Sequence, residues 1–385
     1  MSLFDANTDV YRRQHRITTQ KVDTAIERER EYNELKTALQ RTVDDGAEVT
    51  VAIGPKGSGK TTLVRRGLDE IGDHTNFTTI SIDCTSAGTL YRTLVRVVNE
   101  FRSDENALSK TGYALERVRR TLENELESQS EPTILVFDNI DELDNVDELG
   151  DLARRDKTGV VVTADDAEMS NRITKDTWPA RSVVKFPQYT LDELRSLLQE
   201  WIETSLPNQP VAPETVPLCA AYGIERNGDA QYTLRLLRQG AAIASEDRAD
   251  QVRGRHVQAA KEELERKEVD EHIGNLDEQN QLVLYTLTEL GAAGELPART
   301  TSVYNEYVSV LENAAGIEAN PRSKRRIQNR LNKLVDTGLV EYIAHNKGRA
   351  NGAYRKYELA RNQEAIRSAL AERGRASSRS VSSLF

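Results

Sequence analysis

One stretch near the start of the chain constrains the fold more than any other, the run VTVAIGPKGSGKTTL at residues 49–63. Its first five residues are rich in β-branched side chains, a glycine-rich turn follows, and residues 63–71 have the pattern of a helix. The spacing G-x-x-x-x-G-K-T is typical of a loop whose backbone N–H groups and adjoining helix N-terminus bind a phosphate. The run therefore predicts a strand, a loop and a helix that together bind a nucleotide.

Two side chains of this loop are expected to bind the nucleotide and its metal ion. Lys60 is spaced to reach the β- and γ-phosphates, and the Thr61 hydroxyl is spaced to be a ligand of Mg²⁺. We expect ATP or ADP, with Mg²⁺, as the cofactors. The predicted nucleotide contacts in the loop are Gly54, Gly57, Ser58, Gly59, Lys60, Thr61 and Thr62.

A second nucleotide motif follows at residues 132–138, PTILVFD, an apolar strand that ends in an acid. At the carboxyl end of a buried strand, Asp138 would hold the water shell of Mg²⁺ beside the phosphates. The next residue is Asn139, where many ATPases of this architecture have a Glu that polarises the attacking water. Because an amide cannot accept a proton, general-base chemistry is missing at this position. Glu142 is a candidate substitute, although it lies beyond the strand end.

The rest of the first half alternates between strand and helix patterns. Further strands are expected at residues 76–84, 159–163 and 182–186, and helices at residues 21–41, 90–101 and 111–126. Because the strands are apolar on both faces, the alternation predicts an α/β fold with a parallel sheet covered on both sides. A smaller helical region is expected next, at residues 191–206, 231–244 and 254–269.

The last part of the chain predicts an α+β winged helix-turn-helix: three helices at residues 276–290, 301–315 and 323–337, then a hairpin at residues 339–343 and 353–359. Residues 321–356 carry ten Lys or Arg against two acids, although the whole chain has a net charge of −10. Such a basic segment in an acidic chain favours a polyanion partner, and we expect duplex DNA. The candidate DNA contacts are Lys324, Arg325, Arg326, Gln328, Asn329, Lys347, Arg349 and Asn351.

Composition limits the other possibilities. At 385 residues the chain should form two or three domains. No apolar run approaches the ~20 residues that span a bilayer, and the two cysteines are far apart, so we expect no membrane contact and a cytoplasmic location. A carboxylate-rich surface with few lysines suits a cytoplasm with high salt, because salt screens repulsion, so we hypothesise a halophilic source.

The chain resembles the archaeal Orc/Cdc family of AAA+ replication initiators over nearly its whole length. The fragments that carry the resemblance are IERERE, GPKGSGKTT, SIDCTSAGTLYRTL, FDNIDEL, FPQYT, NGDAQYTLRLL, VYNEYVSVLENAAG and SKRRIQNRLNKLVDTGLV. The resemblance implies binding to replication-origin DNA, with the replicative helicase and paralogous initiators as partners. It also implies five segments, namely a flexible leader at 1–16, an AAA+ base at 17–190, a helical lid at 191–268, a winged helix at 269–363, and a helix end with a disordered tail at 364–385.

The family's nucleotide contacts are matched only in part. Tyr189 stands where the family has a Tyr on the adenine side, but Trp201 replaces an Arg twelve residues later. The family has an Asn, its polar sensor, at the end of the fourth strand. The corresponding residues here are 163–165, TAD, which contain no Asn. Where the family has the Arg of its second sensor, this chain has Gln231. Arg172 aligns loosely with the arginine finger that acts on a neighbouring subunit.

Each missing group stabilises charge on the γ-phosphate, and one such donor is worth on the order of 10²–10³ in rate. We therefore expect a nucleotide-binding, DNA-binding regulator of replication initiation whose ATP hydrolysis is weak. Two alternatives stay open. One is an active AAA+ ATPase that loads helicases with Glu142 or a partner's residue. The other is a regulator of transcription or plasmid maintenance that uses the nucleotide as a structural switch.

Overall fold

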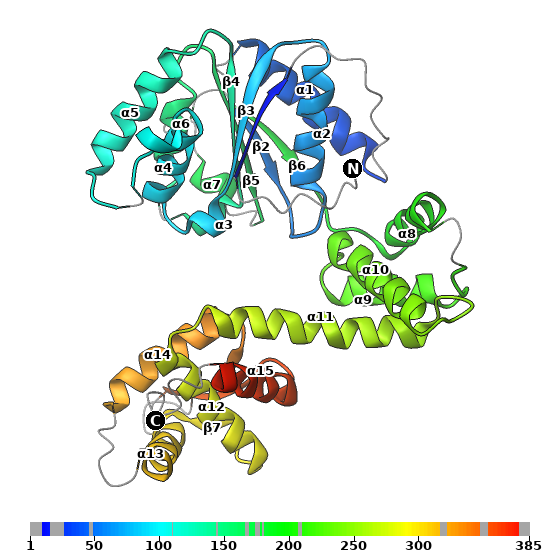
Figure 1. The fold of residues 1–385 in the computed structure, drawn as a ribbon, viewed down its shortest axis with the longest axis vertical. Helices are drawn as coiled ribbons and strands as arrows, with labels where there is room; N and C mark the ends of the chain where they lie inside the picture. Colours follow the sequence, from blue (N-terminus) through cyan, green and yellow to red (C-terminus); the bar gives the residue numbers. More distant parts are fainter. Residues whose placement is uncertain are drawn as a thin grey trace. The chain divides into compact units, whose positions relative to one another are not determined.

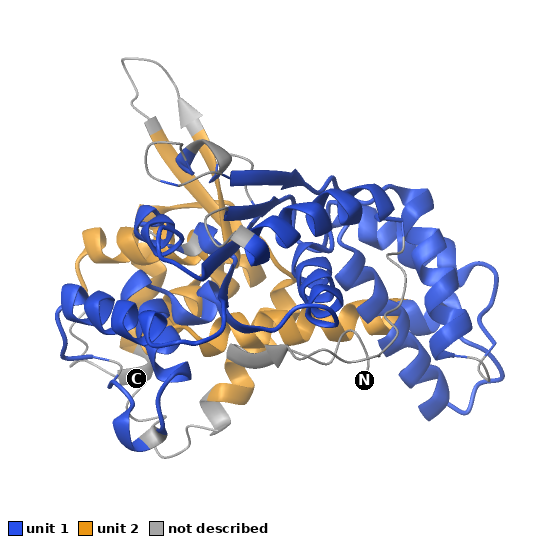
Figure 2. Ribbon diagram, turned by 90° about the horizontal axis from the view of Figure 1, so that it is seen from above, with its two compact units in different colours: residues 1–257 blue, residues 258–385 orange. Residues whose placement is uncertain are grey.

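The computed structural model describes residues 10–15, 27–45, 49–109, 111–143, 145–165, 169–173, 178, 181–206, 210–315, 322–346 and 353–376. It divides into two compact units, Met1–Val257 and Gln258–Phe385 (Figures 1 and 2). None of the helices in these ranges is long and apolar enough to cross a membrane.

A parallel sheet forms the centre of the first unit (Figure 1). Its parallel strands are β2 (Val49–Ile53), β3 (Phe77–Asp83), β4 (Thr133–Asp138), β5 (Thr158–Ala164) and β6 (Arg181–Lys185). They lie in the order β3-β4-β5-β2-β6, so that the strand before the glycine loop has neighbours on both sides. Because β2 and β5 are buried along their whole length, the predicted α/β class with a covered parallel sheet is confirmed.

The flexible leader predicted at residues 1–16 is wrong for part of its length. Val10–His15 form strand β1, which pairs antiparallel with β3 at the edge of the sheet. The sequence VYRRQH has no apolar run to indicate a strand. Pairing of its backbone with the open edge of β3 is the physical reason for the strand, and such a tertiary contact is invisible in local sequence.

Helices cover both faces of the sheet (Figure 1). One face packs against α1 (Glu29–Asp45) and α2 (Lys60–Gly72), and the other against α4 (Leu90–Glu100), α5 (Leu115–Glu127) and α6 (Asp147–Leu152). Two short helices, α3 (Cys84–Ala87) and α7 (Met169–Arg172), follow strands β3 and β5. The helix predicted at residues 21–41 begins at Glu29, and residues 21–26 lie outside the described part of the chain.

Three further helices complete the first unit: α8 (Leu191–Ser205), α9 (Thr215–Glu225) and α10 (Ala230–Glu246). The first begins with a capping box in which Thr190 and Glu193 bond each other's backbone N–H groups. The second was not predicted, because TVPLCAAYGIE contains both Pro217 and Gly223. Pro217 is tolerated because it lies in the first turn, and Gly223 lets Thr233 of α10 approach closely.

The second unit is a winged helix-turn-helix, as predicted. The long helix α11 (Gly254–Gly274) leads into α12 (Glu278–Ala292), α13 (Thr300–Ala315) and α14 (Lys324–Asp336). Strands β8 (Val340–Asn346) and β9 (Ala353–Leu359) form the hairpin, and the short strand β7 (Ala298–Arg299) pairs with β9. β7 was not predicted, since two residues give no periodic pattern.

The predicted end of the winged helix at residue 363 is wrong. Helix α15 (Gln363–Ala376) contributes Ile366 and Ala369 to the same core as α12 and α14. The Arg373 guanidinium also bonds Asp270 at 2.9 and 2.8 Å. An amphipathic helix with so many charges does not reveal from sequence alone what it packs on. Residues 377–385, predicted to be a disordered tail, lie outside the described residues.

Candidate nucleotide site and nucleic-acid interface

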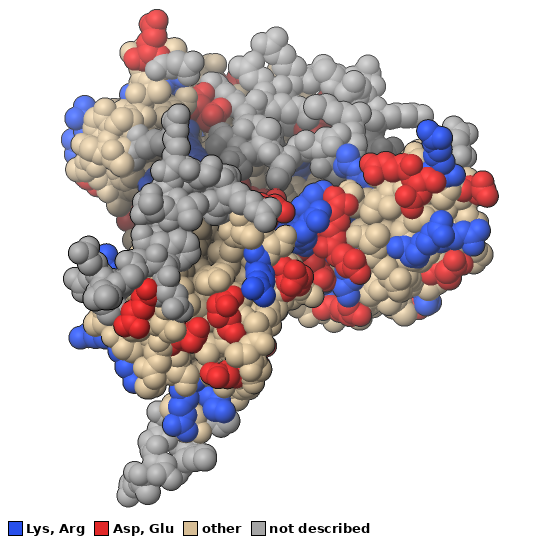
Figure 3. Space-filling view, turned by 60° about the horizontal axis from the view of Figure 1, so that its bottom comes forward, with Lys and Arg blue, Asp and Glu red and all other residues tan. Residues whose placement is uncertain are grey.

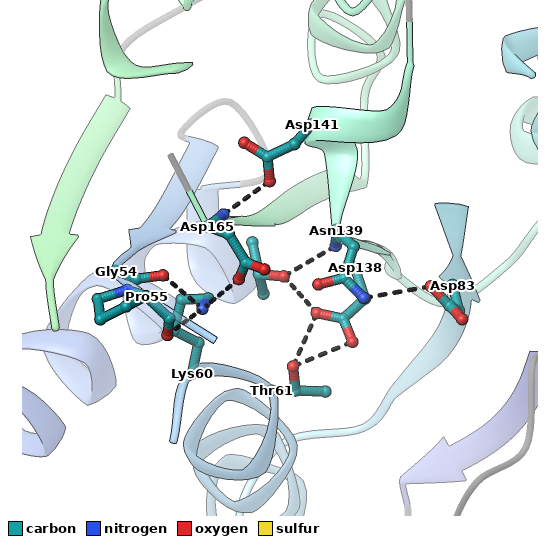
Figure 4. A network of polar contacts seen from close by, with 10 residues as sticks. Gly54, Pro55, Lys60, Thr61, Asp83, Asp138, Asn139, Asp141 and Asp165 are labelled. Atoms are coloured by element: carbon teal, nitrogen blue, oxygen red, sulfur yellow. Dashed lines mark hydrogen bonds and ion pairs between the residues drawn. The ribbon is translucent and has the colours of Figure 1, made fainter. Parts of the chain in front are cut away.

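The glycine loop connects β2 to α2 and lies where the carboxyl ends of β3, β4 and β5 meet (Figure 4). Gly57 and Gly59 have φ angles of 75° and 97°, a region that residues with a Cβ avoid. A Cβ on Gly54 would lie 2.1 Å from the Phe186 carbonyl oxygen. The glycines therefore permit a loop conformation and a close approach that other residues would not.

Lys60 is buried at the start of α2, with 5% of its side chain exposed. Its Nζ donates to the carbonyl oxygens of Gly54 at 2.6 Å and Pro55 at 3.0 Å. It also donates to Asp165 Oδ1 at 2.8 Å (Figure 4). The lysine predicted to bind phosphate is thus ion-paired with Asp165, directly after β5, which the sequence noted only as the last residue of TAD and not as a partner of Lys60.

Thr61 and Asp138, the two predicted Mg²⁺ residues, lie against each other. The Thr61 hydroxyl is 2.8 and 3.0 Å from the two carboxylate oxygens of Asp138, and the Thr163 hydroxyl also donates to that carboxylate. Burial raises the pKa of Asp138, against the lowering effect of these hydroxyl hydrogen bonds. A hydroxyl beside a carboxylate is the oxygen-rich donor pair that suits Mg²⁺. Within the described residues, no three metal-binding side chains form a protein-built metal site.

Asn139 is held in place by two hydrogen bonds. Its φ of 57° turns the chain sharply after β4. Its backbone N–H donates to Thr163 Oγ1 at 3.1 Å, and its side-chain amide donates to Asp83 Oδ1 at 3.2 Å (Figure 4). The position of the missing base is therefore filled by a fixed amide. Glu142 lies in the following turn η2 (Ile140–Glu142), and its side chain lies outside the described part.

Tyr189 is buried and is covered by an arginine that the sequence did not single out. The Arg28 guanidinium lies 3.6 Å from the centre of the Tyr189 ring. It also bonds Glu193 and the Pro187 carbonyl oxygen, each at 3.1 Å. Burial, more than any neighbouring charge, raises the pKa of Tyr189 to about 12. The run IERERE contains two arginines, Arg28 and Arg30, and nothing in the sequence indicates which of them reaches Tyr189.

The N-terminus of α10 touches the glycine loop directly. The Ala230 N–H donates to the Gly57 carbonyl oxygen at 3.2 Å, and Asp229 caps the helix by accepting from Tyr232 N–H at 2.8 Å. A Cβ on Gly57 would lie 2.0 Å from Asp229 Oδ1. Gln231, in the position of the second sensor, is exposed on the first turn of this helix.

The remaining predicted residues of this site lie in different surroundings. Trp201 is half-buried on α8, and Thr62 is half-buried on α2. Ser58 is buried, and its hydroxyl has no partner within the described residues. Arg172, the candidate arginine finger, is exposed and donates to the Leu143 carbonyl oxygen at 3.2 Å.

The candidate DNA helix α14 is amphipathic as predicted. Ile327, Leu331 and Leu334 are fully buried. Four of the predicted DNA contacts are exposed, namely Lys324, Arg325, Arg326 and Asn329.

Gln328, predicted to offer its amide to bases, has partners within the protein in the structure described. Gln328 is half-buried, accepts from the Thr300 hydroxyl and bonds the Tyr357 hydroxyl. Both ends of the amide are thus satisfied within the protein, because β9 lies beside this part of the helix. The wing-tip candidates Lys347, Arg349 and Asn351 lie outside the described residues.

A groove of about 890 Å³ opens between α13, α14 and the base of the hairpin. Its lining residues are Arg299, Thr300, Thr301, Lys324, Arg325, Gln328, Asn332, Ala344, Tyr354 and Arg355. The Arg299 guanidinium lies 3.9 Å from the centre of the Tyr354 ring, a pair that sequence reasoning missed because β7 was not predicted. Acids and bases are interspersed on the face drawn in Figure 3, whereas the residues that line this groove include four basic side chains and no acid.

Three family models match successive parts of the chain. They are an AAA ATPase domain at residues 24–201, a Cdc6 AAA+ ATPase-type lid domain at residues 195–262, and a CDC6 C-terminal winged helix domain at residues 271–369.

Similar proteins match the chain over almost its full length. ORC1-type DNA replication protein 2 of Haloarcula marismortui is 30% identical, over 95% of this chain and 92% of that protein. ORC1-type DNA replication protein 11 of the same organism is 27% identical, over 96% of this chain and 93% of its own length. A solved structure of the Aeropyrum pernix ORC1 protein in complex with DNA has the same fold, with a TM-score of 0.80, 24% identity, and coverage of 93% of this chain and 95% of that chain. The chain therefore belongs to the Orc/Cdc family of AAA+ proteins, whose ORC1-type members include these relatives from a halophilic archaeon.

Proposed function

We propose that this chain is a nucleotide-binding protein that binds duplex origin DNA and regulates the initiation of replication. One observation carries the proposal: a formed phosphate loop and a basic groove on a winged helix occur in one chain. The names of the ORC1-type relatives, which are DNA replication proteins, support the same role.

The groove on the second unit is the proposed contact with DNA. It gathers Arg299, Lys324, Arg325 and Arg355 from strand β7, helix α14 and strand β9. Cations grouped in this way neutralise phosphates, release counter-ions and fix the orientation of the protein on the duplex. Asn329 is exposed one position beyond the fixed Gln328 and is the side chain on α14 that we assign to base edges.

The glycine loop of the first unit is the proposed nucleotide site. Lys60 would bind the phosphates, while Thr61 and Asp138 would hold Mg²⁺. Bound Mg²⁺ supplies charge neutralisation between the phosphates. Arg28 and Tyr189 close the side of the site that the family uses for the base.

Hydrolysis at this site is proposed to be slow. Asn139 cannot act as a base, and its amide is already held by Asp83. Gln231 carries no charge to stabilise a transferring phosphate. Because α10 contacts Gly57, a bound nucleotide would instead change how the helical region docks on the loop. We propose the replicative helicase and paralogous initiators as the partners that respond to this change.

Mapping the protein on the genome by chromatin immunoprecipitation tests the role. An initiator is expected at a few replication origins, and the signal should disappear when Arg325 and Arg355 are both replaced by Ala. Enrichment at promoters with none at origins would contradict the proposal and favour a transcriptional regulator. The double variant must keep the unfolding temperature of the wild type for the comparison to hold.

A further inference from the structure

All three donors of the Lys60 ammonium group are already used. They go to two backbone carbonyl oxygens, of Gly54 and Pro55, and to the carboxylate of Asp165. A phosphate that binds Lys60 must therefore displace one of these acceptors. The carbonyls are fixed in the loop, whereas Asp165 is a side chain with 41% of its surface exposed to water. Asp165 is therefore the acceptor that a phosphate would displace from Lys60.

The backbone holds Asp165 at this place. Its N–H donates to Asp141 Oδ2 at 2.6 Å, directly after strand β5. Two residues earlier, on strand β5 itself, Thr163 donates to Asp138, the acid predicted to hold Mg²⁺. Asp165 therefore stands on the side of the loop where β4 and β5 end (Figure 4). That is the side to which the Mg²⁺ acid directs the terminal phosphate of a nucleoside triphosphate.

The charges around Lys60 make a third phosphate unfavourable there. Asp165 borders the loop on this side and is paired with Lys60 (Figure 4), whereas the charge of Asp138 would be balanced by the Mg²⁺ that it holds. A diphosphate brings less negative charge to this side than a triphosphate does. Either ligand displaces Asp165 from Lys60, but only the third phosphate of a triphosphate lies beside the displaced carboxylate, and like charges at contact distance repel strongly.

We propose that Asp165 is a specificity-determining residue that makes this site prefer a nucleoside diphosphate to a nucleoside triphosphate. The inference rests on the proposed nucleotide-binding function and goes beyond it by naming the preferred ligand and the residue responsible. A triphosphate binds more tightly when the charge of Asp165 is removed or drawn away from the loop.

Equilibrium binding of ADP and of a non-hydrolysable ATP analogue, with excess Mg²⁺, tests the inference. The wild type is expected to bind ADP about tenfold more tightly than the analogue. Asp165→Asn keeps the size of the side chain and removes its charge. It should tighten binding of the analogue about tenfold and change binding of ADP by less than about threefold.

Asp151→Asn is the matched control. It removes one exposed carboxylate from α6, which pairs with Arg119 and has no contact with the loop. Its ratio of the two affinities should equal that of the wild type. If Asp165→Asn unfolds earlier than the wild type without ligand, Asp165→Ser replaces it in the same measurement.

The outcomes separate the two ideas. If neither nucleotide binds the wild type or Asp165→Asn, the nucleotide-binding function itself is wrong and this inference falls with it. If both nucleotides bind and the wild type shows no preference, the function stands and the inference is wrong. If the preference exists but is equal in Asp165→Asn, another residue causes it, and the role of Asp165 is overturned.

Discussion

The side-chain amide of Asn139 donates a hydrogen bond to Asp83 across 3.2 Å, and this contact joins the ends of strands β4 and β3. The amide therefore has a structural partner at the position where related ATPases place a base. A carboxylate in its place would face Asp83 with a like charge. Asn139 is thus fitted to its neighbour, and this contact is a physical reason for its identity that does not depend on catalysis.

We predict that ATP turnover by the wild type is close to background and that Asn139→Glu alone raises it less than about tenfold. The new acid lacks the hydrogen bond to Asp83, and Gln231 still supplies no positive charge to the phosphates. Phosphate release in the presence of DNA is the measurement. Rapid turnover by the wild type that Lys60→Ala abolishes would contradict this prediction and favour an active helicase loader.

The contact between α10 and the glycine loop leads to a second prediction. Gly57→Ala should lower the free energy of unfolding of the first unit and weaken nucleotide binding. The new Cβ would meet Asp229 Oδ1 at 2.0 Å and its Cα at 2.8 Å. Gly88→Ala is the matched control, because Gly88 has a φ of 72° with no atom within 4 Å of its Cβ position.

Urea unfolding of the two glycine variants separates strain from contact. In both variants the positive φ should lower the free energy of unfolding by on the order of 1–2 kcal/mol. Gly57→Ala should cost about 2 kcal/mol more than Gly88→Ala, since overpacking typically costs 1–3 kcal/mol. Equal losses in the two variants would mean that the loop and α10 separate readily, and the proposed coupling of nucleotide to the helical region would lose its support.

The sequence predicts the framework of both units well and the polar contacts within them poorly. Apolar runs such as PTILVFD indicate buried strands, and the glycine loop marks the end of β2 and the start of α2. Three of the elements that were not predicted, β1, β7 and α9, depend on a partner or contain a helix breaker. Local propensity is overridden in such cases by tertiary contacts.

The candidate site shows the same division. Lys60, Thr61 and Asp138 are predictable because their spacing is dictated by the chemistry of phosphate and Mg²⁺. The partners of Lys60 and Gln328, which are Asp165 and Tyr357, lie 105 and 29 residues away in the sequence. No pattern in one sequence encodes which distant side chain satisfies a given donor.

The pair of Arg28 and Glu193 predicts a loss of stability in acid. Burial raises the pKa of Glu193, but the Thr190 N–H and the Arg28 guanidinium lower it more, so the folded value lies below the usual one. A lowered pKa contributes stability above the unfolded value of about 4.3, and that contribution is lost as the pH falls through the folded value. Glu193→Gln should therefore be less stable than the wild type at pH 7, with a difference that shrinks below about pH 4.

Chemical unfolding between pH 7 and pH 3 measures this difference. Glu200→Gln, on the exposed face of the same helix α8, is the control and should follow the wild-type curve. A gap between wild type and Glu193→Gln that stays constant down to pH 3 would show that the ionised carboxylate is not what the pair requires.

The basic groove of the winged helix leads to the last prediction. Arg325→Ala should weaken binding to duplex DNA and reduce the slope of log affinity against log salt by about 1, because each lost phosphate contact releases one counter-ion fewer. Arg367→Ala is the control, since Arg367 is half-exposed on α15, lies within 3.6 Å of Glu289 and does not line the groove. Fluorescence anisotropy over a series of salt concentrations gives both slopes. Equal slopes for the two variants would place the DNA contact elsewhere on the protein.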